Sequence, residues 1–324
     1  MKLIIQPDDG ATALLDAIES AVQSIEIAIF RLDHVEVKRA LERAVSRGVS
    51  VHALIADTNR GNEKDLRKLE TELLASGIEV SRTAHDLLRH HYKFLLIDAR
   101  ILYLLTFNFT YLDMADTRSF GLIIDDSAIV TEVRKLFHSD IRRQPYQPAI
   151  RNVLVSPINA RHELSRFLCG AEEQLLIYNP EVTDRAIIDI LRKRARKGVD
   201  IRIIGQVAKS VDFGASRRLR TRFRTRAIVR DGRAAFLGSQ SLRERELDRR
   251  RELGLIVEQA DVVGALANVF EDDWRSAVSE GKSITAAEPR PLPLAAEALL
   301  RRQVASAIQE AVSGMVSHGT IIRS

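Results

Sequence analysis

The sequence predicts an α/β protein made of two fused copies of one unit, each a mixed, mostly parallel sheet flanked by helices. Two observations predict this fold. Residues 2–55 follow a strand, helix, strand, helix, strand order. The same order returns without a gap 150 residues later, because Pro157 to Gly198 repeats the pattern of Pro7 to Gly48. Such alternation is typical of βαβ units and parallel pairing.

Each expected element has a counterpart in the other copy. Strands are expected at 2–6, 24–30 and 49–55 in the first copy, and at 152–156, 174–178 and 199–204 in the second. Between the strands, apolar residues recur at helical spacing, as Leu14 and Ile18 do in the first copy and Leu164 and Leu168 in the second. The repeat therefore extends to individual positions.

The repeat resumes at a new offset of 133 residues, so the second copy lacks 17 residues. The missing part lies within 57–85, where the first copy has an extra amphipathic helix expected at 63–76. Two tight strands, a third strand and a closing helix complete each copy. The expected organisation is a first repeat (1–141), a linker (142–150), a second repeat (151–280), and a Pro-containing linker with a last helix (281–324).

Composition narrows the range of functions. The 324 residues are 45% hydrophobic and 29% charged, as in globular proteins, and the single Cys169 excludes an intrachain disulfide. No apolar run reaches the roughly 7–15 residues of a secretory signal or the roughly 18–20 of a membrane span. We expect a cytoplasmic protein and leave peripheral contact with a membrane open. The net charge of +5 favours anionic partners.

His91, Lys93 and Asn108 are the candidate catalytic residues. Residues two apart on a strand face the same side, so His91 and Lys93 point together, whereas Asp98 faces away. The hairpin that follows returns Thr106 and Asn108 beside them. An imidazole, an ammonium, an amide and a hydroxyl together suit a phosphate group.

The spacing H-x-K-x4-D, followed by Thr106-x-Asn108, resembles that of the phospholipase D superfamily. The resemblance covers residues 1–280. It implies two repeats related by a pseudo-twofold axis, with their motifs facing each other, and a chemistry that needs no metal or other cofactor. It also implies a phosphohistidine on one histidine and proton transfer by the other, which makes His91 the nucleophile. Leu105 stands where the family usually has glycine.

The second copy has lost the chemical residues of this motif. Arg224, Arg226 and Ser241 align with His91, Lys93 and Asn108, while Asp231 and Gly238-Ser239 persist. Six arginines fall within residues 217–226 and lead into the motif. Because an arginine guanidinium can donate two parallel hydrogen bonds to a phosphate, we expect the second repeat to bind the phosphate of the substrate. The expected phosphate-binding residues are Thr106, Arg224, Arg226, Ser239 and Ser241, with Asp98, Asp231 and Glu252 in supporting roles.

The proton donor is the open question. Arginine does not release a proton usefully, and general acid catalysis contributes about 10²–10⁴-fold. His85, His90 and Glu252 are candidate replacements. In the resembled family, the acidic position matched by Glu252 orients a histidine. A homodimer would bring a second histidine, but the fused second copy already occupies that face.

Three functions remain open at this stage. The favoured one is a phosphodiesterase or phosphatidyltransferase that acts on a phospholipid. The second is a nuclease or nucleic-acid processing enzyme, favoured by the arginines, although only 5% of residues are aromatic. The third is a non-catalytic phosphate-binding module. All three have an anionic phosphodiester as partner, and the oligomeric state stays open.

Overall fold

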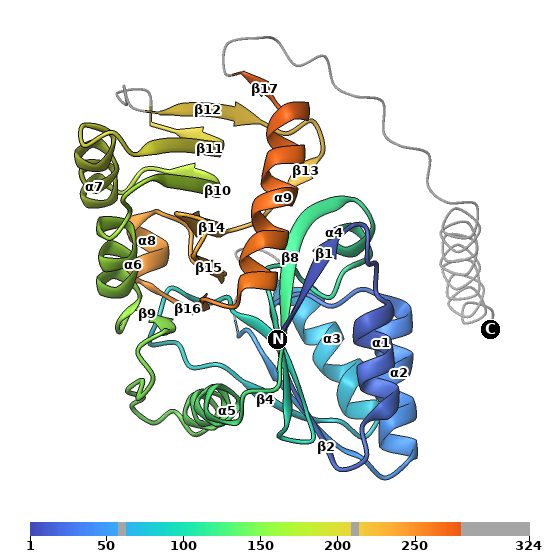
Figure 1. Cartoon of the computed structure of the whole chain (residues 1–324). Helices are drawn as coiled ribbons and strands as arrows, with labels where there is room; N and C mark the ends of the chain where they lie inside the picture. Colours follow the sequence, from blue (N-terminus) through green and yellow to red (C-terminus); the bar gives the residue numbers. More distant parts are fainter. Residues whose placement is uncertain (58–62, 209–213, 280–324) are drawn as a thin grey trace, which may run out of the picture. The chain divides into compact units, whose positions relative to one another are not determined.

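The computed structural model describes residues 1–57, 63–208 and 214–279 (Figure 1). The first repeat consists of β1 (Lys2–Gln6), α1 (Thr12–Ser20), β2 (Ser24–Ile29), α2 (Val35–Ser46), β3 (Ser50–Ile55), α3 (Glu63–Ala75), β4 (Glu79–Arg82), β5 (Arg89–His90), β6 (Lys93–Ile97), β7 (Ile101–Leu105), α4 (Tyr111–Ala115), β8 (Thr117–Ile124) and α5 (Ser127–Arg142). The extra helix of the first copy is thus confirmed as α3.

The second repeat repeats this order without a counterpart of α3. It consists of β9 (Val153–Ser156), α6 (Ala160–Cys169), β10 (Gln174–Val182), α7 (Arg185–Ala195), β11 (Asp200–Val207), β12 (Ala215–Arg218), β13 (Arg222–Phe223), β14 (Ala227–Arg230), β15 (Ala234–Gly238), α8 (Glu244–Asp248), β16 (Arg250–Val257), α9 (Ala260–Ser276) and β17 (Val278–Ser279). The short helices α4 and α8 had not been expected. The expected linker and last helix of 281–324 lie outside the described residues.

Each repeat forms a mixed sheet, which confirms the α/β class. The first sheet runs β1-β8-β7-β6-β2-β3-β4, and the second runs β17-β12-β11-β10-β14-β15-β16-β5 with β9 also on β16. Parallel pairs are fewer than expected. Within the first repeat only β2–β3 and β3–β4 are parallel. The reason is that β6 and β7 form a hairpin, and the segment between β7 and β8 holds the five-residue helix α4, so both connections return the chain antiparallel.

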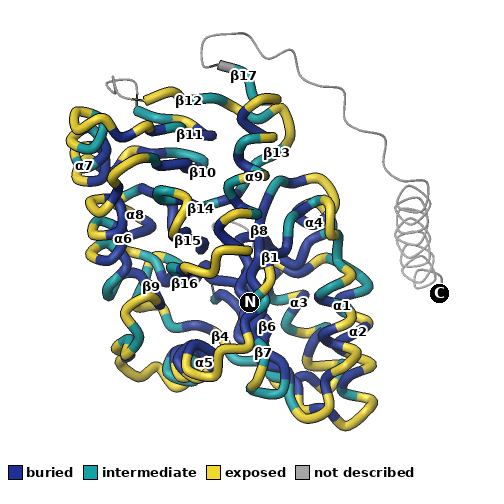
Figure 2. The backbone as a smooth tube through the Cα atoms, in the orientation of Figure 1, coloured by how far each residue is buried: buried dark blue, intermediate teal, exposed yellow. Residues whose placement is uncertain are grey.

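The described part of the chain has three hydrophobic clusters. One lies between the first sheet and α1, α2 and α3, and a second between the second sheet and α6, α7 and α8. The third, the inner core, joins both repeats through the other faces of the sheets and through α5 and α9. Figure 2 shows the strands as mostly buried between these helices. Because the inner core draws on both repeats, they fold onto each other rather than as separate bodies.

The two repeats also exchange short strands. β5 of the first repeat pairs in parallel with β16 of the second, where His90 lies opposite Arg251. β13 of the second repeat pairs in parallel with β8 of the first, where Phe223 lies opposite Arg118. These two exchanges are related by the same 133-residue offset, as a pseudo-twofold arrangement requires.

Reciprocal ion pairs cross the same boundary. Arg251 of the second repeat lies 3.0 Å from Asp140 of the first, and Arg118 of the first lies 3.0 Å from Asp273 of the second. A tyrosine hydroxyl donates to each carboxylate at 2.6 Å, from Tyr92 to Asp140 and from Tyr178 to Asp273. All four charged side chains of the two pairs are largely buried, so each carboxylate is compensated from the other repeat.

No helix in the described ranges has the length and apolar character needed to cross a membrane.

Replacing Asp140 with Asn tests whether these buried pairs hold the repeats together. The change leaves Arg251 buried without its counter-charge, and losing one partner of a buried pair costs about 3–5 kcal/mol. We expect a fall of that size in the free energy of unfolding, measured by urea titration. Arg39→Ala is the control, because Arg39 and Glu36 form an exposed pair worth about 0–1 kcal/mol. Equal effects of the two substitutions would contradict this account.

Candidate active site

His91 lies where the chain crosses from one sheet to the other. β5 pairs with the sheet of the second repeat, β6 belongs to the sheet of the first, and His91 lies between them. Its backbone N–H donates to the carbonyl of Arg251 at 2.8 Å. The sequence had predicted that His91 and Lys93 share one strand. Instead the strand begins at Lys93, and His91 occupies the junction of the two repeats.

Glu252 of the second repeat holds this histidine. Its carboxylate lies 3.0 Å from His91 Nδ1, and both side chains are buried. A carboxylate at Nδ1 calls for a proton on that nitrogen, which leaves the lone pair on Nε2. Burial, followed by the charges of Lys93 and Arg226, lowers the pKa of His91 well below its usual range. The imidazole is therefore neutral at neutral pH, with its lone pair on Nε2.

Lys93 faces that lone pair. Its Nζ lies 3.0 Å from His91 Nε2, and the side chain is fully buried. Burial, with Arg226 and Arg224 nearby, lowers the pKa of Lys93 to about 7, although Glu252 acts in the opposite direction. The structure thus brings His91 and Lys93 together as the sequence predicted, with a cation beside the nucleophilic nitrogen.

Arg224 and Arg226 of the second repeat lie close enough to Lys93 for their charges to lower its pKa. Arg226 is fixed, because its Nε donates to Ser241 Oγ at 2.8 Å and its Nη1 donates to the Arg224 carbonyl at 2.8 Å. Ser241 therefore orients an arginine. The Arg224 guanidinium is about half buried and makes no hydrogen bond or ion pair within the described residues.

Two carboxylates of the site were missed by sequence reasoning. Asp113 accepts from the backbone N–H of Asn108 at 3.0 Å and from its Nδ2 at 2.6 Å. Glu246 accepts from the backbone N–H of Ser241 at 2.9 Å and lies 3.0 Å from Arg250. The signal was in the sequence, since Asp113 and Glu246 are related by the 133-residue offset. Each carboxylate fixes the residue that ends its motif.

Thr106 and Ser239, which are expected to bind phosphate, each use the hydroxyl to bind the backbone of a neighbouring strand. The Thr106 hydroxyl donates to the carbonyl of Phe120 at 2.9 Å and accepts from its N–H at 3.0 Å. The Ser239 hydroxyl makes the same exchange with Leu253. Both hydroxyls thus fasten the end of a hairpin to the next strand, because a buried hydroxyl takes an available backbone partner.

Leu105 stands where the resembled family usually has glycine, and it packs against Gly121 of the neighbouring strand. A Cβ added at Gly121 would lie 3.0 Å from Leu105 Cδ2, so the glycine opposite makes room for the leucine. In the second repeat the aligned Gly238 and Gly254 face each other more closely, and a Cβ on Gly238 would lie 2.6 Å from the Gly254 Cα.

Asp98 and Asp231 lie away from the site, in the turns that follow β6 and β14. The Asp98 carboxylate accepts from the backbone N–H groups of Val22, Gln23 and Ser24. The Asp231 carboxylate does the same with residues 172–174. Burial alone would raise the pKa of each carboxylate, but the three backbone hydrogen bonds outweigh it and lower the pKa.

Neither of the other two histidines considered as proton donors reaches this group. His85 is largely exposed and lies 3.2 Å from Asp57. His90 is buried on the other side of its strand, 3.9 Å from Asp140. Of the three candidates only Glu252 lies in the site, where it contacts His91. The arginine run is also divided, because Arg217 donates to the carbonyl of Trp274 and stacks over its ring.

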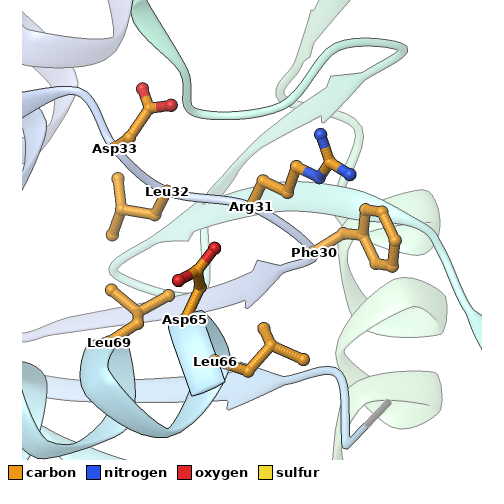
Figure 3. A pocket seen from close by; sticks show the side chains of 7 residues that line it. All are labelled: Phe30, Arg31, Leu32, Asp33, Asp65, Leu66 and Leu69. Carbon is orange, nitrogen blue, oxygen red and sulfur yellow. The ribbon is translucent and has the colours of Figure 1, made fainter. Parts of the chain in front are cut away.

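A pocket of about 170 Å³ adjoins the site in the first repeat. Figure 3 shows the segment 30–33 after β2 along one side and Asp65, Leu66 and Leu69 of α3 along the other. Phe30 lines this pocket and also contacts the active site, because its ring meets the His91 ring edge-on with the ring centres 4.7 Å apart. The helix that only the first repeat has therefore shapes the space next to the nucleophile.

The described residues contain no group of three or more His, Cys, Asp or Glu side chains arranged to hold a metal ion. The charges of the site come from its own arginines, lysine and carboxylates.

Comparisons with known proteins agree with this geometry. Residues 14–141 and 164–274 match the family described as cardiolipin synthase, PLD-like domain. No match was found among curated proteins. The solved structures that share the fold include the following two. Polyphosphate kinase from Porphyromonas gingivalis has a TM-score of 0.71 at 19% identity over 94% of this chain, which spans 55% of that protein. Phosphatidylserine synthase from Haemophilus influenzae has a TM-score of 0.66 at 11% identity, covering 96% of this chain and 94% of that one.

The family match takes in most of both repeats, including His91, Lys93, Asn108 and the altered second motif. The chain therefore belongs to the PLD-like domain family of cardiolipin synthase, within the phospholipase D superfamily.

Proposed function

We propose that the protein is a phosphodiesterase or phosphatidyltransferase that forms a phosphohistidine on His91 and takes a phospholipid as substrate. Members of the superfamily are phosphoryl-transfer enzymes. The observation that carries the proposal is the contact of His91 Nδ1 with Glu252, which leaves Nε2 unprotonated beside Lys93. A neutral imidazole with a fixed orientation is an activated nucleophile.

The reaction would proceed in two steps. His91 Nε2 attacks phosphorus while Lys93, Arg224 and Arg226 stabilise the charge on the phosphoryl oxygens, and the ester bond to the leaving group breaks. Water or an alcohol then attacks the phosphohistidine, the P–N electron pair returns to Nε2, and the proton of the attacking hydroxyl passes to the oxyanion of the leaving group. Glu252 accepts a hydrogen bond from Nδ1 throughout and stabilises the imidazolium that forms in the first step.

Two features near the site favour a lipid. Leu88, three residues before His91, and Leu112, next to Asp113, are among the few large apolar side chains left exposed. The description of the matched family also names a lipid synthase. Apolar side chains beside a cationic site suit an amphiphile with an anionic headgroup.

The nuclease alternative is supported by the six arginines of residues 217–226. This support is weaker than expected, because Arg217 contacts Trp274. The alternative of a non-catalytic binding module is supported by the altered second motif, which lacks the histidine, lysine and asparagine of the first. It predicts anion binding without turnover, so a substrate panel separates the three functions.

The test is turnover of phospholipid vesicles, bis(p-nitrophenyl) phosphate and single-stranded DNA by the wild type and by His91→Ala. We expect turnover of the phospholipid and the aryl diester and a loss of at least about 10³-fold in His91→Ala, the scale on which covalent catalysts lose rate when the nucleophile is removed. His162→Ala is the matched control, because His162 is exposed. Turnover that survives His91→Ala, or binding without any turnover, would contradict the proposal.

Lys93 gives the pH dependence of the reaction a definite sign. The ammonium is present below its pKa and is lost as pH rises through about 7. We expect kcat/KM for bis(p-nitrophenyl) phosphate to fall above pH 7. No acid limb is expected near 6.5, because the pKa of His91 is lowered well below that value.

Lys93→Arg should flatten the fall above pH 7, since arginine keeps its charge throughout this range. Lys135→Arg, at an exposed lysine, is the matched control. A wild-type profile that is flat from pH 6 to 9, or a fall that persists in Lys93→Arg, would show that Lys93 does not supply this charge.

A further inference from the structure

A second pocket lies at the junction of the two repeats, behind the strands that carry the active site. His90 of β5 lies opposite Arg251 of β16, and both line this pocket, whose volume is about 270 Å³. The residues that follow them, His91 and Glu252, contact each other in the active site. Because successive side chains of a strand point to opposite faces, the same two strands serve the pocket on one face and the active site on the other.

Two buried side chains of the pocket have hydrogen-bonding groups without a protein partner. His90 is 6% exposed and Arg251 is 7% exposed. Neither ring nitrogen of His90, nor Nε of Arg251, makes a hydrogen bond within the described residues. The carboxylates of Asp86 and Asp140 lie 3.5 and 3.9 Å from the His90 nitrogens, beyond the usual range of about 2.7–3.2 Å. Burial lowers the pKa of His90, so its neutral ring has one N–H to donate. Buried donors without a partner are unfavourable, and the pocket therefore suits a ligand that accepts hydrogen bonds.

The other half of the molecule shows which group Arg251 lacks. Arg118 is related to Arg251 by the 133-residue offset. Besides its buried ion pair, Arg118 donates from Nη1 to the carboxylate of Asp8 at 2.8 Å. Among the described residues, Arg251 pairs with Asp140 alone. The 150-residue offset puts Ile158 at the position of Asp8, and an isoleucine side chain offers no acceptor. Arg251 is thus without the second anion that its counterpart binds.

The chain around the pocket is longer and more polar than in the other half. Six residues (83–88) connect β4 to β5, whereas three residues (219–221) connect β12 to β13. The longer connection supplies Ala84 to the wall of the pocket. The position related to His90 is occupied by Phe223, which packs against the inner core. A polar pocket in one half therefore corresponds to apolar packing in the other.

Arg143 adds a positive charge to the pocket. This residue follows α5 in the left-handed conformation, with a φ of 56°, and its exposed side chain lines the pocket. Ser276 stands at the related position of the second repeat. Of the two carboxylates that line the pocket, Asp140 is compensated by Arg251. The other, Asp86, is 60% exposed, where water and salt screen its charge. The charges of the pocket thus favour an anion.

We propose that this pocket is a second ligand site, which binds a phosphate group between His90, Arg251 and Arg143. Their donors come from β5, from β16 and from the end of α5. Three directions suit the tetrahedral oxygens of a phosphate better than the two coplanar oxygens of a carboxylate. Because the ligand contacts both strands, it stabilises the pairing that holds His91 beside Glu252. The proposal does not depend on the chemistry of the active site.

The test is isothermal titration calorimetry of the full-length protein with inorganic phosphate. We expect His90→Phe and Arg143→Asn each to weaken binding to the pocket by about 10- to 100-fold, as for a lost hydrogen bond to a charged group. The phenylalanine copies Phe223, and asparagine tolerates the left-handed conformation. Arg142→Asn is the matched control, because Arg142 is exposed next to Arg143 and does not line the pocket.

Binding of phosphate in the active site is separated from binding in the pocket by Arg224→Gln, which changes only the former. Thermal unfolding in phosphate and in acetate gives a second measurement, because a ligand that binds the folded state raises the Tm. Far-ultraviolet circular dichroism checks the fold of each variant. Arg143 is exposed, so Arg143→Asn decides the test if His90→Phe does not fold.

The proposal is supported if the pocket variants lose phosphate binding that Arg142→Asn and Arg224→Gln retain. It is overturned if the pocket variants bind phosphate as the wild type does, or if Arg224→Gln alone abolishes all binding. Acetate that raises the Tm as much as phosphate would overturn the assignment to a phosphate group. None of these results depends on turnover by His91, so this proposal and the proposed function fail separately.

Discussion

The hydrogen bond between Glu252 and His91 is the interaction on which the site depends, and it exists only because the repeats are interlocked. β5 leaves the first repeat to pair with β16, and this pairing sets His91 beside the residue that follows Arg251. A carboxylate and an imidazole 161 positions apart in the sequence thus meet in a buried place. The ion pairs of Asp140 and Asp273 hold the same boundary between the repeats. The contacts that hold the two repeats together therefore also set the position of His91.

Duplication followed by loss on one side has made this site asymmetric. The first repeat has the imidazole and the second has the carboxylate that orients it, whereas Arg224 and Ser119 occupy the positions related to these two by the 133-residue offset. The supporting residues stayed symmetric. Asp98 and Asp231 bind equivalent loops, and Asp113 and Glu246 hold equivalent motif ends.

Much of the fold could be predicted from the sequence, because a repeat with fixed offsets gives each element twice. The helix α3 could be predicted from the length difference between the copies together with its amphipathic pattern. The exchanged strands β5 and β13 could not be predicted, since two-residue strands carry no periodicity and their pairing is set by contacts between the repeats. The share of parallel strands was overestimated because the hairpins after β6 and β14 add antiparallel neighbours. In the site, His91, Lys93 and Glu252 converge as their alignment suggested. The hydroxyls of Thr106 and Ser239 are hydrogen-bonded to the backbone of the neighbouring strand, which a motif spacing does not reveal.

The most direct measurement of the central claim is a rapid-quench experiment that traps the covalent intermediate under alkaline conditions, where a phosphoramidate survives, followed by mass spectrometry of the peptide containing residue 91. The account predicts a phosphoryl adduct on His91 that forms during turnover of an aryl phosphodiester and is absent from Glu252→Gln, whose amide no longer supplies the anionic partner of Nδ1. Turnover without any adduct on His91, or an adduct that forms equally fast in Glu252→Gln, would contradict it.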